Sequence, residues 1–496
     1  MRTIETDKLI ERFSWCSIKM QNQETFCLPV NRLYRYDGQY YETKLYAWEI
    51  PRIVYLSVIN SNDYGTAELP IDWDTLVQLF KEYDCRNTVV EESDEEDGNY
   101  IYHLLLGITA EQGPYQRLQF KSVWIHERII RDYYILVKAT HFKHHGVIDV
   151  NSAISQLFGC TVDDYVALLF LVLWLCTISP SPLSIPENKY RKNDSTVFTR
   201  NNLQKLIEHY TCSYSDLRTS GLKSQLLISK PFVRTERTKI CYSSSVHLVH
   251  MMIANGLYWV VRDYYSCNNI DFPGAFGSLF EDYIKDLADR YCCSDEWATI
   301  PRDAGGKRKN GIQSNIENAD FFFNFGSYRL IVEAKSCLLP LNARQQSPNT
   351  ESIRTFYNRA ITKAYKQIQS TLSLPYYNDS IVPGSVTLKI ILLYDEFSTT
   401  AVIERLYNEP FETDLHCFAL TIRDFEILLY LHHHDQEKCN KVFRTVLQRV
   451  KGGKRTDNNN FAETYKKLSI NRNPHFDENP DYFTELMQYV KQQYSD

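Results

Sequence analysis

A tight turn between two strand-like runs is the feature that most constrains how this chain can fold. The runs at residues 319–325 and 328–335 are rich in aromatic and β-branched residues, and only Gly-Ser at 326–327 separates them. Such a loop is typical of a β-hairpin, because glycine readily adopts the positive φ that the turn requires. The turn sets the register of the two strands, and counting outward from it places Asp320 opposite Glu333.

The predicted register gathers three charged side chains at one end of the hairpin. Directly opposed residues share a face of the sheet, with Cβ atoms about 4.5–5.5 Å apart, so we expect Asp320 and Glu333 to be neighbours. Lys335 follows two residues after Glu333 and points to the same face. Two carboxylates this close repel each other unless a cation lies between them. Ligation by oxygen alone favours Mg²⁺ or Mn²⁺, which can activate water beside a phosphate.

The spacing of these residues resembles a known nuclease motif. Asp320, thirteen residues ahead of Glu333-Ala334-Lys335 on an adjoining strand, is similar to the signature of the PD-(D/E)XK nuclease superfamily, which has the restriction-endonuclease-like fold. The resemblance implies one or two metal ions held by Asp320, Glu333 and the carbonyl of Ala334. It also implies that Lys335 orients the attacking water.

Two flanking helices extend the resemblance. Glu281, before the hairpin, resembles the acidic residue often found on the family's first core helix, and the resemblance implies that it assists metal binding. Gln367, after the hairpin, resembles a glutamine seen in many members, and it also lies inside the apolar stripe of its own helix. A polar group facing inward needs a partner, and the metal site supplies one. Ala319 stands where the family name has proline, a position that varies and binds no metal.

Ordinary structural roles compete with each of these assignments. In the competing interpretation, a solvated sheet face carries a cross-strand ion cluster formed by Asp320, Glu333 and Lys335. Gln367 is then a buried amide bonded to the backbone, and Glu281 is a surface carboxylate. The agreement of register, spacing and flanking helices favours the metal site over the ion cluster.

Basic residues close to the hairpin are candidates for nucleic-acid binding. A glycine-interrupted loop just before the first strand is able to grip phosphates, although a solvated linker is the alternative interpretation. The formal net charge of −6 argues against non-specific coating of nucleic acid, so any positive surface has to be local. The candidates are Arg302, Lys307, Arg308, Lys309 and Lys363.

The order of patterns along the 496 residues predicts an α/β protein with several parts. We expect an N-terminal mixed α/β region at 1–114 and a mainly helical region at 115–270. A PD-(D/E)XK nuclease-like domain with a restriction-endonuclease-like αβββαβ core follows at 271–435, and a helical C-terminal tail at 436–496. Within the first region, residues 52–56 look like a strand.

Hydropathy and cysteine usage indicate a cytoplasmic protein without a membrane segment. The strongest apolar run, Val166 to Ile178, has thirteen residues, whereas a bilayer span needs about 20, so we expect a buried helix. The first residues show neither the basic segment nor the long apolar segment of a secretory signal peptide, so we expect no export. Thirteen cysteines without a C-x-x-C pair fit reduced thiols.

Zinc ligation is not the preferred interpretation of the histidine and cysteine clusters. His432, His433 and His434, with Cys439 nearby, are interpreted as residues at a helix C-terminus. The adjacent pair Cys292-Cys293 is poorly arranged to chelate one ion together.

These patterns together favour a Mg²⁺-dependent (or Mn²⁺-dependent) endonuclease that hydrolyses phosphodiester bonds, with DNA as the expected substrate. Similar enzymes with large N-terminal regions suggest, by analogy, a role in bacterial defence against phage or mobile DNA. Two alternatives stay open: an RNA-cleaving nuclease, and a catalytically inactive nuclease-fold module that binds nucleic acid or a protein partner. The N-terminal region is the expected site of a homo-oligomer or partner contact.

Overall fold

The computed structural model describes most of the chain. The residues that it describes are 4–21, 27–36, 39–65, 121–138, 148–178, 200–221, 223–301, 317–340, 350–374, 384–395, 414–451, 459–478 and 488.

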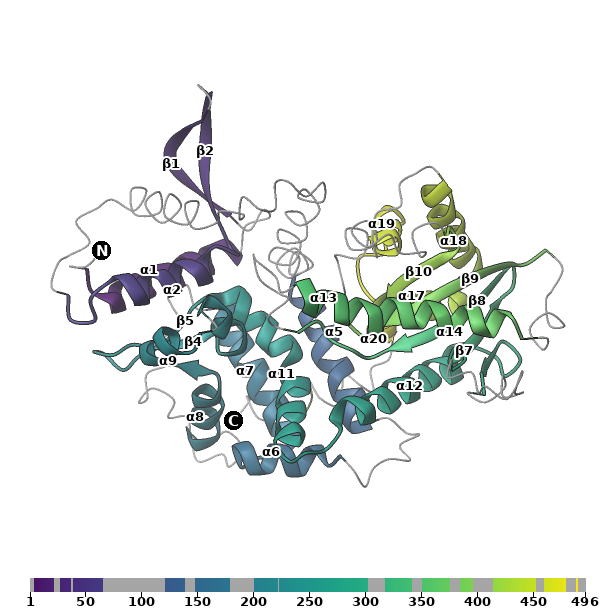
Figure 1. The fold of residues 1–496 in the computed structure, drawn as a ribbon, viewed down its shortest axis with the longest axis horizontal. Helices are drawn as coiled ribbons and strands as arrows, with labels where there is room; N and C mark the ends of the chain where they lie inside the picture. The colour runs from purple at the N-terminus through teal and green to yellow at the C-terminus, as the bar shows by residue number, and fades with distance from the viewer. Residues whose placement is uncertain are drawn as a thin grey trace.

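The N-terminal half is built mainly from helices (Figure 1). Its helices are α1 (Thr6–Gln21), α2 (Ile50–Asn60), α5 (Lys121–Tyr133) with the π-helical turn η3 (Tyr134–Lys138), α6 (Val150–Phe158), α7 (Val162–Ile178), α8 (Arg200–His209), α9 (Tyr214–Thr219), η4 (Lys223–Gln225), α10 (Leu226–Ser229) and α11 (Val246–Cys267). Its strands are β1 (Cys27–Tyr36), β2 (Gln39–Tyr46), β3 (Thr211–Cys212), β4 (Phe232–Arg234) and β5 (Cys241–Ser243).

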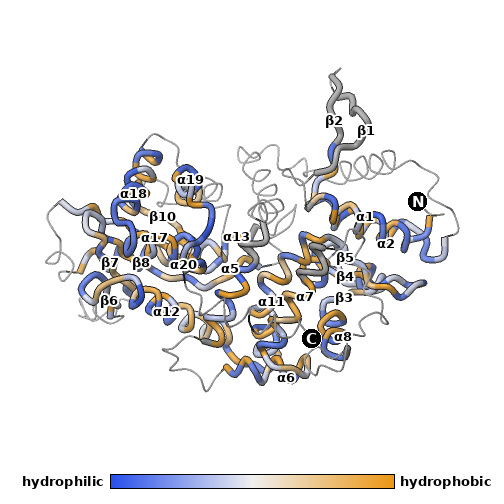
Figure 2. The backbone as a smooth tube through the Cα atoms, turned by 180° about the vertical axis from the view of Figure 1, so that it is seen from behind, coloured by the Kyte–Doolittle hydropathy of each residue, from blue (hydrophilic) through white to orange (hydrophobic). Residues whose placement is uncertain are grey.

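The long helix α11 is the centre of this half, since α1, α5, α6 and α7 all pack against it. Figure 2 shows hydrophobic residues along α7 and α11, where these helices meet. The apolar run at 166–178 lies within α7, and the side chains from Tyr165 to Phe170 are buried, as expected of a core helix. Within the described residues, no helix by itself has the length and hydropathy of a membrane span. The bent pair Val150–Phe158 and Val162–Val172, at 60°, meets that criterion only jointly.

The prediction of a strand at residues 52–56 is wrong, because these residues belong to the helix α2. Pro51 is in the first turn of this helix, where a missing N–H costs nothing. The buried residues Ile53, Val54, Ser57 and Val58 recur at helical spacing, and α2 packs against α1 and α9. Burial of this stripe therefore outweighs the preference of β-branched residues for strands.

The C-terminal half contains a five-stranded mixed sheet (Figure 1). Its elements are α12 (Phe272–Tyr291), β6 (Trp297–Thr299), β7 (Phe321–Phe325), β8 (Tyr328–Lys335), α13 (Thr350–Tyr357), the π-helical turn η6 (Asn358–Thr362), α14 (Lys363–Leu372), β9 (Val386–Leu393), β10 (Cys417–Thr421), α17 (Ile422–His434), α18 (Gln436–Lys451), α19 (Asn459–Lys467) and α20 (Pro474–Glu478). The whole chain is therefore of the mixed α/β class.

The sheet has the strand order β10-β9-β8-β7-β6 and is covered on both faces. β7 runs antiparallel to β6 and β8, whereas β9 and β10 run parallel to β8. Side chains alternate along β8, so Val332 joins the core with α12 and α17 and Ile331 joins the core with α13 and α14. The alternate residues of β8 that lie on the same face as Ile331, namely Glu333 and Lys335, consequently face α14.

Helix α5 of the N-terminal half forms buried ion pairs with residues of the C-terminal half. Arg131 forms a bidentate pair with Glu426 of α17, with both N···O distances at 2.6 Å. Arg128 donates to Asp395 at 3.2 Å, just after β9. Asp132 accepts a hydrogen bond from the hydroxyl of Tyr394, the neighbour of Asp395. The two halves consequently share one continuous set of buried side chains.

Candidate active site at the open end of the β7–β8 hairpin

The predicted turn and strand register are confirmed. Gly326 has φ +66°, and Phe325 pairs with Tyr328 directly across the turn. The pairing continues without a shift as far as Phe321 and Val332. The candidate site therefore lies at the open end of the hairpin, away from the turn.

Asp320 lies one residue beyond the last paired position and departs from the regular ladder. Its N–H donates to the carbonyl of Val332 at 3.1 Å, and its carbonyl accepts from the N–H of Ile300 at 2.8 Å. Its Oδ2 accepts the N–H of Ala334 at 2.9 Å. The simple cross-strand pairing expected with Glu333 is thus replaced by a carboxylate that caps the backbone of the neighbouring strand. Both neighbouring strands hold the Asp320 backbone in place.

Glu333 is a buried carboxyl group with an unfilled bonding position. Only 2% of the residue is exposed. Its Oε1 accepts from Lys335, whereas its Oε2 is buried and receives no hydrogen bond from the described residues. Burial, followed by the negative charge of Asp320, raises the pKa of Glu333 to about 8, although Lys335 opposes the shift. A carboxylate at this position is poorly stabilised until a further positive charge arrives.

Lys335 and Gln367 meet on the α14 side of the sheet. The Nζ of Lys335 donates to Oε1 of Gln367 at 2.9 Å, and it also donates to Glu333. Gln367 is buried, as its place in the apolar stripe of the helix predicts, and the partner of its side-chain oxygen is a site residue rather than the backbone. The amide therefore holds the ammonium group beside the two carboxylates.

Thr371 is a positioning residue that the sequence interpretation missed. It lies one turn after Gln367 on α14 and is fully buried. Its hydroxyl accepts the N–H of Ala319 at 2.7 Å and donates to the carbonyl of Gln367 at 2.9 Å. The segment that carries Asp320 is thereby tied to the helix that carries Gln367. The i, i+4 spacing of the two polar residues on one apolar stripe was a signal for this role.

The backbone carbonyl of Ala334 adds a third oxygen on the Asp320 side. Lys335 uses its own carbonyl to accept the N–H of Tyr394 at 3.0 Å, on the β9 side of the strand. Successive peptide groups of a strand point in opposite directions within the sheet. The carbonyl of Ala334 consequently points toward β7, where Asp320 lies. Two carboxylates and a carbonyl are the ligands that Mg²⁺ and Mn²⁺ prefer, and the unfilled Oε2 of Glu333 fits such a cation.

Glu281 does not share the face on which these side chains meet. It is half-buried on α12, which packs on the Val332 face of the sheet. Gly277 lies one turn earlier on the same side of α12. A Cβ atom added to it would lie 3.4 Å from the hydroxyl oxygen of Ser336. Glu281 therefore comes from the helix on the opposite face of the sheet, near the end of β8, and its assistance to metal binding stays a prediction.

The predicted nucleic-acid contacts are only partly within the described residues. Arg302, Lys307, Arg308 and Lys309 lie outside them. Lys363 begins α14, one turn before Gln367, and its exposed ammonium lies 3.5 Å from the carboxylate of Glu317. Since Glu317 precedes Asp320 by three residues, Lys363 is at the rim of the candidate site.

Comparisons with known proteins supply no family for this chain. No protein-family model, no curated protein and no solved structure matches the chain. Function is therefore inferred from the side chains themselves.

Proposed function

We propose that this chain is a divalent-metal-dependent nuclease of the PD-(D/E)XK type that hydrolyses phosphodiester bonds, with DNA as the expected substrate. The observation that carries the proposal is Glu333, a carboxyl group that is buried and, within the described residues, incompletely hydrogen-bonded, and whose pKa is raised first by burial and then by the charge of Asp320. Perturbed carboxyl groups of this kind gather at catalytic sites. A purely structural ion cluster would satisfy both oxygens of a buried carboxylate.

The order of elements supports the same proposal. Among the described residues, a helix (α12), three strands (β6–β8), a helix (α13–α14) and a strand (β9) occur in this order along the chain. This is the αβββαβ order that the resemblance implies. The strands β8 and β9 are parallel neighbours in the centre of the sheet, and the candidate residues lie at or beyond the carboxyl end of β8. Ligand sites of α/β sheets commonly occupy such strand ends.

Each residue has a distinct part in the proposed reaction. Asp320, Glu333 and the carbonyl of Ala334 would hold Mg²⁺ or Mn²⁺, which supplies an activated water and neutralises charge on the phosphate. Lys335 orients the attacking water and donates toward the phosphate oxygen on which negative charge builds. Gln367 keeps Lys335 in place, because its Oε1 accepts one of the ammonium protons.

An exposed basic stripe borders the site and suits a polyanionic substrate. Arg359, Lys363 and Lys366 are exposed and recur at about one-turn spacing along η6 and α14, the helix that carries Gln367. Cations on such a stripe can contact successive phosphates without reading the bases. The stripe therefore supports a nucleic acid as the substrate, rather than a small phosphate ester.

The decisive experiment is a cleavage assay with the full chain on single- and double-stranded DNA and RNA, with Mg²⁺, Mn²⁺ or EDTA. We expect metal-dependent cleavage of DNA. Glu333→Ala and Lys335→Ala should each reduce the rate about 100-fold or more, since each removes a group that stabilises the transition state. Lys389→Ala is the matched control, because it breaks the pair between Lys389 of β9 and Asp414, which precedes β10, outside the site.

Three outcomes separate the alternatives. Cleavage that survives both Glu333→Ala and Lys335→Ala rules out this site as the catalyst. Cleavage of RNA alone identifies an RNA nuclease. Absence of any cleavage, with binding of nucleic acid retained, favours the inactive module.

A further inference from the structure

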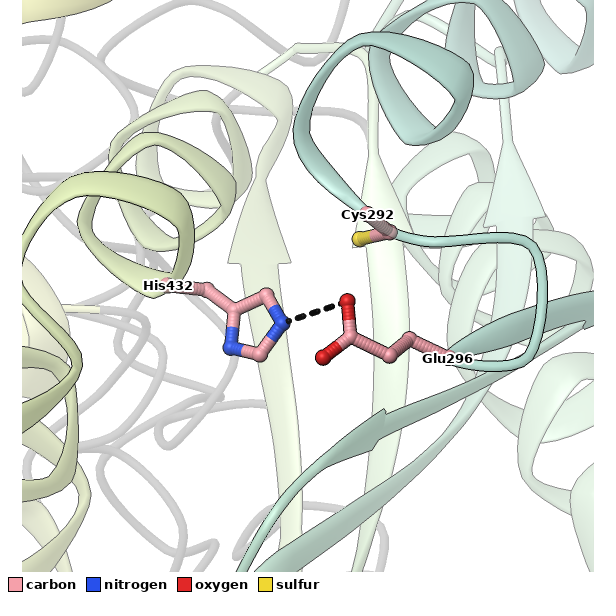
Figure 3. A group of neighbouring side chains, drawn as sticks. All are labelled: Cys292, Glu296 and His432. Carbon is pink, nitrogen blue, oxygen red and sulfur yellow. Dashed lines mark ion pairs between the residues drawn. The ribbon is translucent and has the colours of Figure 1, made fainter.

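Three side chains that are distant in the sequence meet at the turn end of the sheet. Cys292 ends α12, Glu296 lies just before β6, and His432 is in the last turn of α17. Figure 3 shows the three side chains turned toward one another. Because His432 stacks on Phe325 beside the turn, and Glu333 lies five residues along β8, the two clusters are about 17 Å apart along the strand.

The distances within this cluster fit a tetrahedral ion. One ligand atom from each of Cys292, Glu296 and His432 lies within 4.8 Å of the other two. The Nε2 of His432 is 3.2 Å from Oε2 of Glu296. Two donors that are each about 2.0–2.1 Å from a tetrahedral zinc ion lie about 3.3 Å apart. The nitrogen and oxygen are therefore already at the spacing of two zinc ligands.

Surrounding contacts hold two of these side chains in position. The ring of His432 stacks on Phe325, with ring centroids 4.2 Å apart, and its side chain is 4% exposed. The N–H of Cys293 donates to Oε2 of Glu296 at 2.8 Å. Glu296 is 31% exposed, so the cluster opens to solvent on its side. A preformed ligand set with an open side can admit an ion without rearrangement of the core.

We propose that Cys292, Glu296 and His432 bind one Zn²⁺ through three side-chain ligands, with solvent in the fourth position. A thiolate, an imidazole and a carboxylate select zinc over Mg²⁺, which prefers the all-oxygen set at the other end of the hairpin. On binding, the thiol of Cys292 gives up its proton to solvent, and His432 binds through Nε2 with its ring proton on Nδ1. The ion joins the end of α12 to β6 and α17.

This proposal revises the interpretation of His432 as a simple helix-end residue. Its zinc partners are not His433, His434 or Cys439, which neighbour it in the sequence, but residues more than 130 positions away. Long-range pairing of this kind leaves no local spacing for a sequence pattern to reveal.

Cobalt titration of the full chain, in excess Mg²⁺, tests the site independently of cleavage. We expect one Co²⁺ per chain, with the visible bands of a tetrahedral ion and a near-ultraviolet sulfur-to-cobalt band. Zinc should displace the cobalt and raise the melting temperature, since a ligand that binds only the folded chain stabilises it. Cys292→Ser should abolish the sulfur band, and Glu296→Gln should weaken binding roughly 100-fold.

Matched controls keep this test specific. Cys267→Ser removes an exposed thiol outside the cluster, and His433→Asn removes the imidazole next to His432, so both variants should retain the cobalt spectrum. Asp320→Asn should retain it as well, which separates this site from the proposed nuclease site. An unchanged spectrum in Cys292→Ser and Glu296→Gln, or no tetrahedral cobalt in the natural chain, overturns the proposal and leaves His432 and Glu296 as an ion pair.

Discussion

Two buried glutamates of the C-terminal half differ in how their oxygens are used. Glu426 accepts four hydrogen bonds: two from Arg131, one from Tyr283 at 2.7 Å and one from Asn473 at 2.5 Å. Glu333 accepts from Lys335 through one oxygen, and its other oxygen receives no hydrogen bond within the described part of the chain. Both residues have 2% exposure or less. The protein thus uses both oxygens of one buried carboxyl group and leaves one oxygen of the other without a hydrogen bond from the described residues.

The difference separates a structural charge from a functional one. A buried ion pair is tolerated when its geometry is good and every lone pair is used, as at Arg131 and Glu426. An incompletely bonded carboxyl group costs folding free energy, and natural proteins keep such groups chiefly at functional sites. The four predictions below test this contrast, from the largest expected effect to the smallest.

Breaking the saturated pair should have the largest effect on stability. Arg131→Met leaves Glu426 as a buried, unpaired charge, so we expect the free energy of unfolding to fall by about 3–5 kcal/mol. Urea unfolding followed by circular dichroism measures the loss. Lys239→Met, which breaks a largely exposed pair with Glu236, is the matched control and should cost less than about 1 kcal/mol. If Arg131→Met lowered the free energy of unfolding by less than about 1 kcal/mol, the saturated pair would not differ from an exposed one.

Neutralising the unsaturated carboxyl group should stabilise the metal-free protein at alkaline pH. The pKa of Glu333 is raised from 4.5 to about 8, so the folded chain binds more protons than the unfolded chain between these values. The free energy of unfolding therefore falls as pH rises through this window. In EDTA, Glu333→Gln should be more stable than the natural chain at pH 8 by roughly 1–3 kcal/mol, with a smaller difference at pH 5.

Metal supplies the control for this pH dependence. Mg²⁺ should raise the stability of the natural chain at pH 8, because it compensates the charge of Glu333, and should have little effect on Glu333→Gln. Stability curves that run parallel from pH 5 to pH 8 in EDTA would contradict the proposed role of this carboxyl group.

Removing the partner of the site ammonium should affect catalysis more than metal binding. Gln367→Leu deprives Lys335 of an acceptor and leaves Asp320 and Glu333 in place, so we expect kcat to fall about tenfold at unchanged Mg²⁺ affinity. Cleavage kinetics across a Mg²⁺ titration separate the two parameters. Gln369→Leu, which removes an amide bonded to Tyr365 on the same helix, should leave both unchanged. A loss of Mg²⁺ affinity in Gln367→Leu would assign this residue to metal binding instead.

The smallest effect is expected at the rim. Lys363→Ala should weaken DNA binding a few-fold and reduce the slope of log affinity against log salt by about 1, because one phosphate contact is lost. Binding is measured with catalysis blocked by EDTA. Lys466→Ala, an exposed lysine on α19, should leave the slope unchanged. Equal slopes for the two variants would exclude Lys363 from the substrate path.

The hairpin and its helix could be predicted because their signals are local. Gly326 marks the turn, and the alternation along β8 brings Glu333 and Lys335 to one face. The 3.6-residue period of α14 directs Gln367 inward. Backbone geometry links such neighbours over a few residues, so the sequence alone was sufficient to place them.

Contacts between distant segments were decided only by the tertiary structure. Nothing near Arg131 in the sequence indicates that it pairs with Glu426, and nothing near His432 indicates that Glu296 lies beside it. The helix at residues 52–56 formed because burial against α1 outweighed local strand preference. Such contacts depend on how the whole chain packs, a free energy summed over many remote residues that no short window of sequence contains.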